Sequence, residues 1–308
     1  MKIGVLGNAD SWYISQLSAV GSRLGHAVFP LLFPDFQART SDTRLTMACG
    51  DTDVTRLDAV IVRTMPPGSL ERVVTRMDLL SGLEAAGVRV INTPRAIECA
   101  VDKWLTSQKL TQAGIPVPET AVCEDSDTAI ELFGQLGGDV LVKPLFGSEG
   151  RGILRVDSVD LAWRIFRSLE RIGSVIYLQR FIPDADGDYR VLLLDGNVIG
   201  SMKRTAPPDD FRTNAAQDGI CRPWTPTDEE VRLAMTAANL TDCVFCGIDL
   251  IREDGVMKVL EVNAVPGWKA LQKTCGICVP TLLFQWLAES FNTDFNTDRF
   301  SREAQWLH

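Results

Sequence analysis

Two Asp-Gly dipeptides, each between two runs of apolar residues, constrain the fold of this chain most strongly. They are Asp195-Gly196 and Asp254-Gly255. Asp-Gly favours the tight two-residue turn that joins antiparallel strands, because both residues tolerate a positive φ. The sequence therefore predicts two β-hairpins. Their strands are expected at residues 188–194, 197–203, 244–252 and 256–263.

Residues 1–92 alternate between short apolar strands and amphipathic helices. Strands are predicted at 2–6, 59–63 and 88–92, and helices at 11–24 and 78–86. This alternation indicates a small doubly wound α/β unit. Its first turn lacks the G-x-G-x-x-G pattern, which argues against a dinucleotide site there.

Asn92-Thr93-Pro94 marks the first domain boundary, since either of the first two residues can cap a helix that has the proline in its first turn. A second α/β unit follows, with a strand at 139–144 and a helix at 159–171. A further helix is predicted at 279–290. We therefore predict an N-terminal domain at 1–92, a central subdomain at 93–181, a C-terminal subdomain at 182–291 and a polar tail at 292–308.

Composition removes several function classes. The chain has 308 residues, with 31 Lys and Arg against 40 Asp and Glu, for a formal charge of −9. Nucleic-acid binders need clustered cations to meet phosphates, so this acidic balance argues against a nucleic-acid partner. No apolar run approaches the roughly 20 residues of a membrane helix, and the first residues do not resemble a signal peptide. We expect a cytoplasmic protein without a membrane partner, whose cysteines are reduced.

Histidine is scarce, and the two that occur are His26 and His308. His308 is the last residue of the sequence, and His26 lies in a predicted loop that enters a strand. A Ser–His–Asp hydrolase and a His-ligated zinc enzyme are therefore poorly supported. We expect the chemistry to depend on carboxylates, Lys, Arg and a metal ion.

Asp249, Glu261 and Asn263 are the candidate metal ligands. Glu261 and Asn263 are two residues apart, so they face the same side of their strand. The turn between the two strands can bring Asp249 near them. Carboxylate and amide oxygens suit Mg²⁺. The alternative is a solvated polar face of an edge hairpin, although the flanking Val, Leu and Ile residues argue for burial.

Lys143 ends an apolar strand and precedes a loop, Gly147–Gly152, with three glycines. Backbone N–H groups of such a loop can approach phosphate oxygens while the lysine adds charge. No Gly-Lys-Ser/Thr follows, so this is not a Walker motif, and an ordinary hairpin loop fits the pattern equally well. Further cations lie beside segments that also carry Asp188 and Asn214. They are Lys103, Arg190, Lys203, Arg204 and Arg212.

A set of motifs within residues 92–291 resembles the ATP-grasp superfamily and, within it, the RimK-like α-L-glutamate ligases. The motifs are Asn92–Ile97 with Asp102-Lys103, Gly114–Pro118, Lys143-Pro144 with the loop 147–152, Gln179–Ile182, Gly187–Arg190, Phe211–Asn214, Gly247–Asp249 and Glu261–Gly267. The last motif is specific, whereas the glycine loop alone is not. The resemblance implies an ATP-grasp fold, in which a small Rossmann-like N-terminal domain precedes two α+β subdomains that clasp ATP.

The same resemblance implies roles for individual residues. Residues implied in ATP binding are Lys103, Lys143, Gly147, Ser148, Gly150, Gly152, Gln179, Arg180, Phe181, Asp188 and Asn214. Residues implied in catalysis are Arg190, Arg204 and Arg212, and those implied in holding one or two Mg²⁺ or Mn²⁺ ions are Asp249, Glu261 and Asn263. The loop 147–152 would close as a lid. Arg180 departs from the family, where this position is often acidic.

The implied reaction is ATP-dependent formation of an amide from an acceptor carboxylate and an amine, through an acyl phosphate. The amine would come from L-glutamate, and the acceptor would be a coenzyme or a protein C-terminus. The segment 264–272 slightly favours a coenzyme, and its residues 268–272 would shape the acceptor pocket. A homo-oligomer is suggested by analogy only. Alternatives are a glutathione-synthetase-like or D-Ala-D-Ala-ligase-like enzyme and a non-catalytic, nucleotide-binding regulatory protein.

Two Cys-x-x-Cys pairs, Cys243 with Cys246 and Cys275 with Cys278, leave three interpretations open. Two such pairs can form a Cys₄ zinc site, but the spacer here is longer than usual and contains the candidate metal hairpin. A redox pair is the second interpretation. Buried reduced thiols are favoured, because Cys246 lies in an apolar strand.

Overall fold

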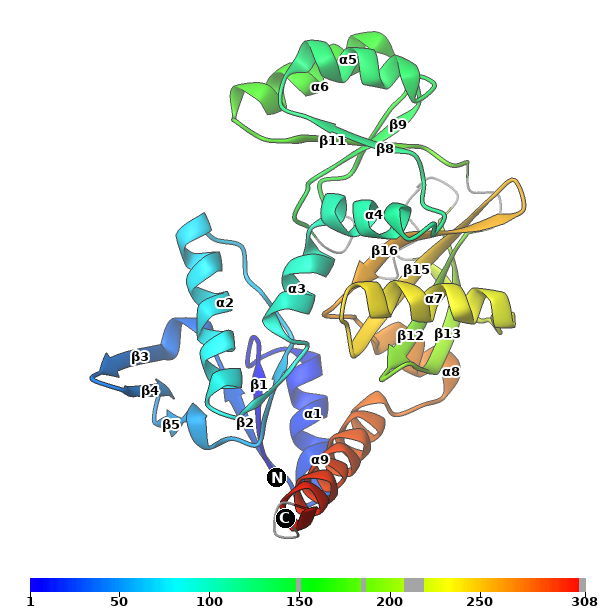
Figure 1. Ribbon diagram of the computed structural model, residues 1–308. Helices are drawn as coiled ribbons and strands as arrows, with labels where there is room; N and C mark the ends of the chain where they lie inside the picture. The colour runs from blue at the N-terminus through cyan, green and yellow to red at the C-terminus, as the bar shows by residue number, and fades with distance from the viewer. Residues whose placement is uncertain (148–150, 184–186, 208–218, 305–308) are drawn as a thin grey trace. The chain divides into compact units, whose positions relative to one another are not determined.

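The computed structural model describes residues 1–147, 151–183, 187–207 and 219–304, with side chains described as far as Phe291. The chain divides into two compact units (Figure 1). One consists of residues 1–94 and 276–308, and the other of residues 95–275. Within the described residues, no helix combines the length and the apolar character needed to cross a bilayer.

A parallel sheet with the strand order β2-β1-β6-β7 forms the centre of the first unit. Its strands are β1 (Lys2–Leu6), β2 (Ala27–Leu31), β6 (Ala59–Val62) and β7 (Arg89–Ile91). Helix α1 (Trp12–Arg23) begins where the Ser11 hydroxyl accepts a hydrogen bond from the backbone N–H of Tyr13. Helix α2 (Leu70–Ala85) begins after Ser69, well before the predicted start at residue 78. The parallel order confirms the predicted α/β unit.

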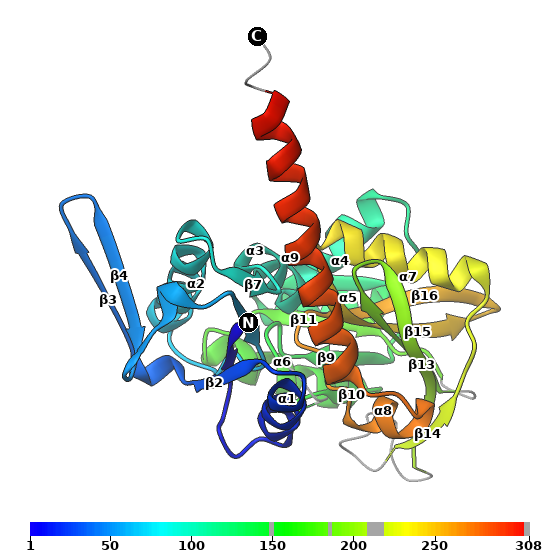
Figure 2. The same ribbon diagram turned by 90° about the horizontal axis from the view of Figure 1, so that it is seen from below.

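A small antiparallel sheet in the first unit was not predicted. It consists of β3 (Phe36–Ser41), β4 (Arg44–Cys49) and β5 (Thr52–Asp53), between the short 3₁₀ helices η1 (Phe33–Asp35) and η2 (Val54–Arg56). In Figure 2 the β3–β4 hairpin projects away from the parallel sheet of its unit. Most of its side chains are exposed. Strand β3 buries none of its side chains and shows no apolar alternation in the sequence. Strand β4 has Leu45, Met47 and Cys49 on one face, but only the last two are buried.

The closing helix α9 (Val279–Ala304) is longer than the predicted helix at 279–290 and takes in most of the expected tail. It packs against α1, where Gly21 lies under the ring of Phe284. Contacts therefore group α9 with the first unit rather than with the C-terminal part. The division into four segments stays a prediction.

The second unit contains two antiparallel sheets. The first has the order β10-β9-β11-β8, and its strands are β8 (Thr120–Cys123), β9 (Val140–Lys143), β10 (Leu154–Val156) and β11 (Ile176–Arg180). Helices α5 (Ser126–Gln135) and α6 (Val159–Arg171) lie side by side on one face of this sheet (Figure 1). Phe133, Phe166 and Leu178 are buried between the two layers. Helices α3 (Pro94–Val101) and α4 (Lys103–Gln112) precede it.

The second of these sheets has the order β14-β13-β12-β15-β16. Its strands are β12 (Asp188–Leu194), β13 (Asn197–Thr205), β14 (Ile220–Pro223), β15 (Phe245–Glu253) and β16 (Val256–Asn263). Both predicted hairpins are confirmed, and the residues of their Asp-Gly turns have positive φ. Helix α7 (Asp228–Leu240), which begins with a capping box at Thr227 and Glu230, contacts this sheet, and α8 (Lys269–Cys275) contacts β13 and β14.

Candidate functional site

The three candidate metal ligands lie together on one face of the β15–β16 ladder. Asp249 is paired in register with Glu261, and Gly247 with Asn263. The Asn263 amide donates to a carboxylate oxygen of Asp249 at 3.3 Å. Side chains alternate along β15, so Arg252 points to the face opposite Asp249. Arg252 donates to Glu230 of helix α7 at 2.7 Å, which places α7 against that opposite face. The face with Asp249 is therefore not covered by α7.

Two arginines neutralise Asp249. Arg190, paired with it in register on β12, donates from Nε and Nη2 to the two carboxylate oxygens at 2.7 and 2.6 Å. Arg204 lies 3.1 Å from the same carboxylate. Burial alone would raise the pKa of Asp249, but the charges and hydrogen bonds of these arginines lower that pKa to about 2.

Arg204 and Asp188 form a second buried pair beside the first. They are paired in register on β13 and β12, and Arg204 donates to the two oxygens of Asp188 at 2.5 and 2.7 Å. Both side chains are almost fully buried. The carboxylates outweigh the effect of burial and raise the pKa of Arg204. Lys203 points to the other face of the strand, over the ring of Tyr189, so it does not join the other cations as the sequence suggested.

Lys143, the last residue of β9, is buried and donates to the side-chain carbonyl of Gln179 at 2.6 Å. Desolvation lowers the pKa of Lys143 to about 8, although Glu261 and Asp249 oppose that shift. The amide of Gln179 in turn donates to the Thr120 hydroxyl at 3.2 Å. Thr120 lies on the neighbouring strand β8, and no local pattern in the sequence marks it as part of the site.

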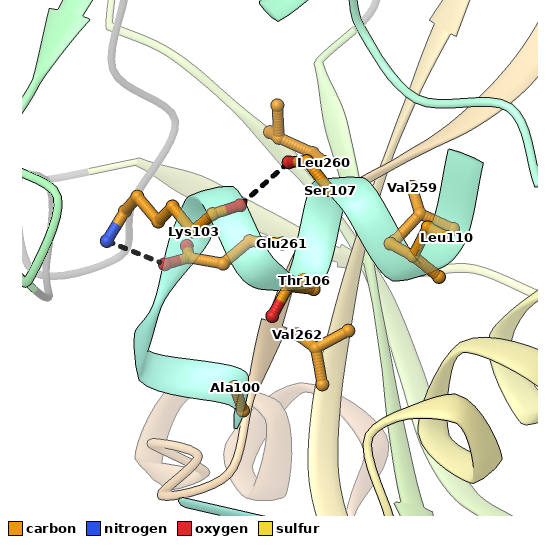
Figure 3. Close-up of a pocket in the computed structure, with 9 residues that line it drawn as sticks. All are labelled: Ala100, Lys103, Thr106, Ser107, Leu110, Val259, Leu260, Glu261 and Val262. Carbon is orange, nitrogen blue, oxygen red and sulfur yellow. Dashed lines mark hydrogen bonds and ion pairs between the residues drawn. The ribbon is translucent and has the colours of Figure 1, made fainter. Parts of the chain in front are cut away.

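Lys103 begins helix α4, whose N-terminus is capped by Asp102. Its ammonium group donates to the backbone carbonyl of Gly147 at 2.9 Å and lies 3.5 Å from Glu261. In Figure 3 the Lys103 and Glu261 side chains converge beside a small cavity between α4 and β16. That cavity has a volume of about 10 Å³, which is room for a single water. The lysine therefore connects α4, the glycine loop and the metal hairpin.

Arg180 is the last residue of β11, and Phe181 follows it. Arg180 pairs with Glu253 at 2.6 Å, and the Phe181 ring lies under Arg155, at 3.8 Å from its guanidinium carbon. Gly152 has a positive φ of 75°. Ser148, Gly150, Arg212 and Asn214 were also predicted, but they lie outside the described residues.

Two further sequence expectations can be compared with the structure. The ring of Trp268, at the start of the segment 268–272, is fully buried and contacts Phe245, so it cannot line an acceptor pocket. Cys243 and Cys246 are buried thiols. No group of three or more His, Cys, Asp or Glu side chains is arranged to hold a metal ion in the described part of the chain, so the Cys₄ zinc interpretation gains no support there.

The charges of the site suit a polyanion. Lys103, Lys143, Arg190 and Arg204 face Asp188, Asp249 and Glu261, so this set of side chains carries one net positive charge. Asn263 adds an amide oxygen, and the Glu261 side chain is about a third exposed. The carboxylates are already paired with cations, and a bound ion would share or replace those contacts. Oxygen donors in a net cationic setting fit a divalent ion that arrives with phosphates.

A scan against protein families matches the RimK-like ATP-grasp domain over residues 100–287. The chain belongs to the RimK-like ATP-grasp family. It is therefore an ATP-dependent carboxylate–amine ligase, and the resemblance noted in the sequence is confirmed. The order of the two antiparallel sheets and the parallel unit is the ATP-grasp fold that the sequence implied.

Curated relatives and solved structures agree with this assignment. The chain is 28% identical to "Tetrahydromethanopterin:alpha-L-glutamate ligase" of Methanosarcina acetivorans, over 93% of this chain and 98% of that protein. It is 34% identical to "Probable alpha-L-glutamate ligase" of Maridesulfovibrio salexigens, over 67% and 69%. The ATP-grasp ligase PsnB, solved with a minimal precursor, has a similar fold, with a TM-score of 0.74, 20% identity and coverage of 93% and 98%.

Proposed function

We propose that this enzyme adds L-glutamate to an acceptor carboxylate, using ATP and Mg²⁺. The observation that carries the proposal is the gathering of Asp249, Glu261 and Asn263 on one face of a sheet, beside Lys103, Lys143 and the two arginines. Two relatives that align over most of the chain are named as an α-L-glutamate ligase or a probable one, which supports glutamate as the added amino acid.

Asp249, Glu261 and Asn263 would hold one or two Mg²⁺ ions, or Mn²⁺ in their place. When bound, the metal would offset charge on the terminal phosphates of ATP. Lys103 and Lys143 would bind phosphate oxygens, and Gln179, Arg180 and Phe181 would adjoin the base. Two contacts support this division: Lys103 donates to the backbone carbonyl of Gly147 in the glycine loop, and Lys143 donates to Gln179, so the phosphate side adjoins the base side.

The reaction would proceed in two displacements. An oxygen of the acceptor carboxylate attacks the γ-phosphorus, the bond to the β-phosphate oxygen breaks, and ADP leaves. The amine of glutamate then attacks the carbonyl carbon of the acyl phosphate, and inorganic phosphate leaves from the tetrahedral intermediate. Arg190, Arg204 and Arg212 would stabilise negative charge in both steps, a task that requires positioned cations and no histidine.

The acceptor class follows from the comparisons only in outline. One relative is named for tetrahydromethanopterin, a small coenzyme, and PsnB was also solved with a precursor peptide. A small coenzyme with a free carboxylate is our first candidate, because the relative named for one aligns over nearly the whole length of both proteins. A peptide C-terminus is the second. The oligomeric state of the enzyme is to be measured in the same preparations.

The test combines phosphate release with mass spectrometry. Purified protein receives ATP, Mg²⁺, one amino acid and one acceptor from a panel of coenzymes and peptides. We expect phosphate release only with L-glutamate and an acceptor, and a product heavier by one or more glutamyl residues. Preference for another amino acid would favour the glutathione-synthetase-like or D-Ala-D-Ala-ligase-like alternative. ATP binding without phosphate release across the panel would favour the regulatory alternative.

The metal assignment has its own variants. Glu261→Gln and Asp249→Asn should each abolish turnover. Asp160→Asn, which removes an exposed carboxylate paired with Arg164 on α6, is the control and should leave the rate unchanged. A Glu261→Gln enzyme that turns over as fast as the wild type would show that Glu261 holds no metal.

A further inference from the structure

Arg180 ends strand β11, and its side chain reaches out of the first sheet of its unit to the second. Its Nη2 donates to Glu253, the last residue of β15, at 2.6 Å. Glu119 lies 3.7 Å from the other terminal nitrogen, Nη1. The Glu253 side chain is only 13% exposed, whereas that of Arg180 is 39% exposed. The contact is therefore a partly shielded ion pair rather than a loose surface one.

Glu253 is held from its other side by Lys258 of strand β16, which donates to the second carboxylate oxygen. Burial raises the pKa of Glu253, but the hydrogen bonds and charges of Lys258 and Arg180 outweigh burial and leave that pKa below its ordinary value. The carboxylate is thus ionised at neutral pH and shared between two cations. We call Arg180, Glu253 and Lys258 the strand latch.

The strand latch joins the two strands that carry the two halves of the candidate site. Gln179, which binds Lys143, precedes Arg180 on β11. Asp249 lies four residues before Glu253 on β15. A fixed distance between Arg180 and Glu253 therefore fixes the position of Gln179 and Lys143, on the nucleotide side of the site, relative to Asp249 on the metal side. The arginine that departs from the family's usual acidic residue has an acidic partner of its own.

We propose that Glu253 is a positioning residue that acts through Arg180 to hold these two sheets in the arrangement that binds ATP. This inference rests on the proposed function, because it takes the site between the sheets as the nucleotide site. Without the ion pair, the binding-competent arrangement is less populated, and the apparent Kd rises in inverse proportion to that population. Once ATP is bound the geometry is the same, so the chemical step keeps its rate.

The test measures ATP binding directly by calorimetry with Mg²⁺ present, and turnover separately. Glu253→Gln and Arg180→Gln should each raise the Kd for ATP about fivefold, as expected for a charge-assisted bond that is partly exposed. The double variant should bind ATP no more weakly than Arg180→Gln alone, because Glu253 acts on the site only through Arg180. Arg180→Lys, which keeps a charged donor, should recover most of the affinity. Arg164→Gln, which breaks the exposed pair with Asp160, is the matched control and should leave the Kd unchanged.

Kinetics and salt distinguish positioning from a general loss of structure. Glu253→Gln should raise the KM for ATP with a kcat within about twofold of wild type. Between about 0.05 M and about 0.5 M salt, the wild-type Kd should rise more steeply than that of the double variant. Additive effects of the two changes, or a fall in kcat with an unchanged KM, would overturn the inference. If wild-type protein binds ATP but ligates nothing, the proposed reaction is refuted, and the Kd values of the variants still test the role of Glu253. If wild-type protein binds no ATP, both the proposed reaction and the role of Glu253 are refuted.

Discussion

Arg190 and Asp249 lie opposite each other on neighbouring strands, and the guanidinium of Arg190 meets both oxygens of the Asp249 carboxylate at 2.6–2.7 Å. A buried carboxylate is costly unless it is paired, and this one is also 3.1 Å from Arg204. The pairing lets the sheet carry an ionised aspartate in its interior. A divalent ion at Asp249 would therefore meet a carboxylate that is already oriented and ionised.

The first prediction concerns the loss of that carboxylate. Asp249→Asn leaves Arg190 without its ion partner and removes one of two from Arg204, so the free energy of unfolding should fall by about 3 kcal/mol. Urea denaturation followed by circular dichroism measures this change. The control is Asp160→Asn, whose exposed pair with Arg164 should contribute no more than about 0.5 kcal/mol. An equal effect of the two variants would contradict the role given to the buried pairing.

The second prediction is a pH dependence that originates at Lys143. Burial lowers its pKa from the ordinary 10.5 to about 8. Above about pH 8 the free enzyme loses the charge that would bind phosphate, so kcat/KM for ATP should fall as the pH rises through that value. The Lys143→Arg variant keeps its positive charge over the whole pH range, so its kcat/KM for ATP should not show this fall at high pH. If kcat/KM still falls at high pH in Lys143→Arg, the fall reports the titration of another group.

The same lysine should affect stability with a defined sign. Below about pH 8 the amine is charged in both folded and unfolded chains, so the cost of burying that charge is fully present. Between about pH 8 and 10.5 the unfolded chain holds more protons than the folded one, so the contribution of Lys143 to the free energy of unfolding rises with pH. Lys143→Met should remove this slope. Unfolding at several pH values measures it, and an identical slope in the variant would assign it elsewhere.

The third prediction concerns Gly187, where the chain passes close to Arg204. Gly187 has φ of 97°, and a Cβ atom there would lie 2.1 Å from the Arg204 backbone oxygen. Gly187→Ala should lower the free energy of unfolding by about 3 kcal/mol or more, because backbone strain adds to a clash with the backbone of Arg204. It should also reduce turnover by displacing Arg204. Gly255→Ala is the matched variant, since its φ of 82° is similar but no atom lies within 4 Å. Gly255→Ala should lower the free energy of unfolding by about 1 kcal/mol and leave the rate of phosphate release unchanged. Thermal unfolding and phosphate release measure both.

The fourth prediction tests the cysteines. Cys243 and Cys246 are buried in the second unit. If they serve as small apolar side chains, Cys243→Ala with Cys246→Ala should destabilise the protein by about 2 kcal/mol and leave the rate of ligation intact. Metal analysis of the untagged protein should find no stoichiometric zinc. One equivalent of zinc in the wild type that is lost in the variant would restore the zinc interpretation.

Local patterns in the sequence were sufficient for both hairpins of the large sheet. The Asp-Gly turns set the pairing of the strands, and side-chain alternation placed Glu261 and Asn263 on one face. The β3–β4 hairpin escaped prediction because its side chains are mostly exposed. The full length of α9 was not predicted, because its C-terminal half lacks an evident apolar stripe in the sequence.

The sequence by itself determined the secondary structure of the site, the family and the identity of the oxygen and cationic side chains. Only the tertiary structure decided which of them meet: Arg190 and Arg204 with Asp249, Lys143 with Gln179, and Arg180 with Glu253. Turn chemistry and strand alternation act over a few neighbouring residues and can be read directly. These contacts between strands join residues 36 to 73 positions apart, and they form only after sheet order and burial have brought those strands together.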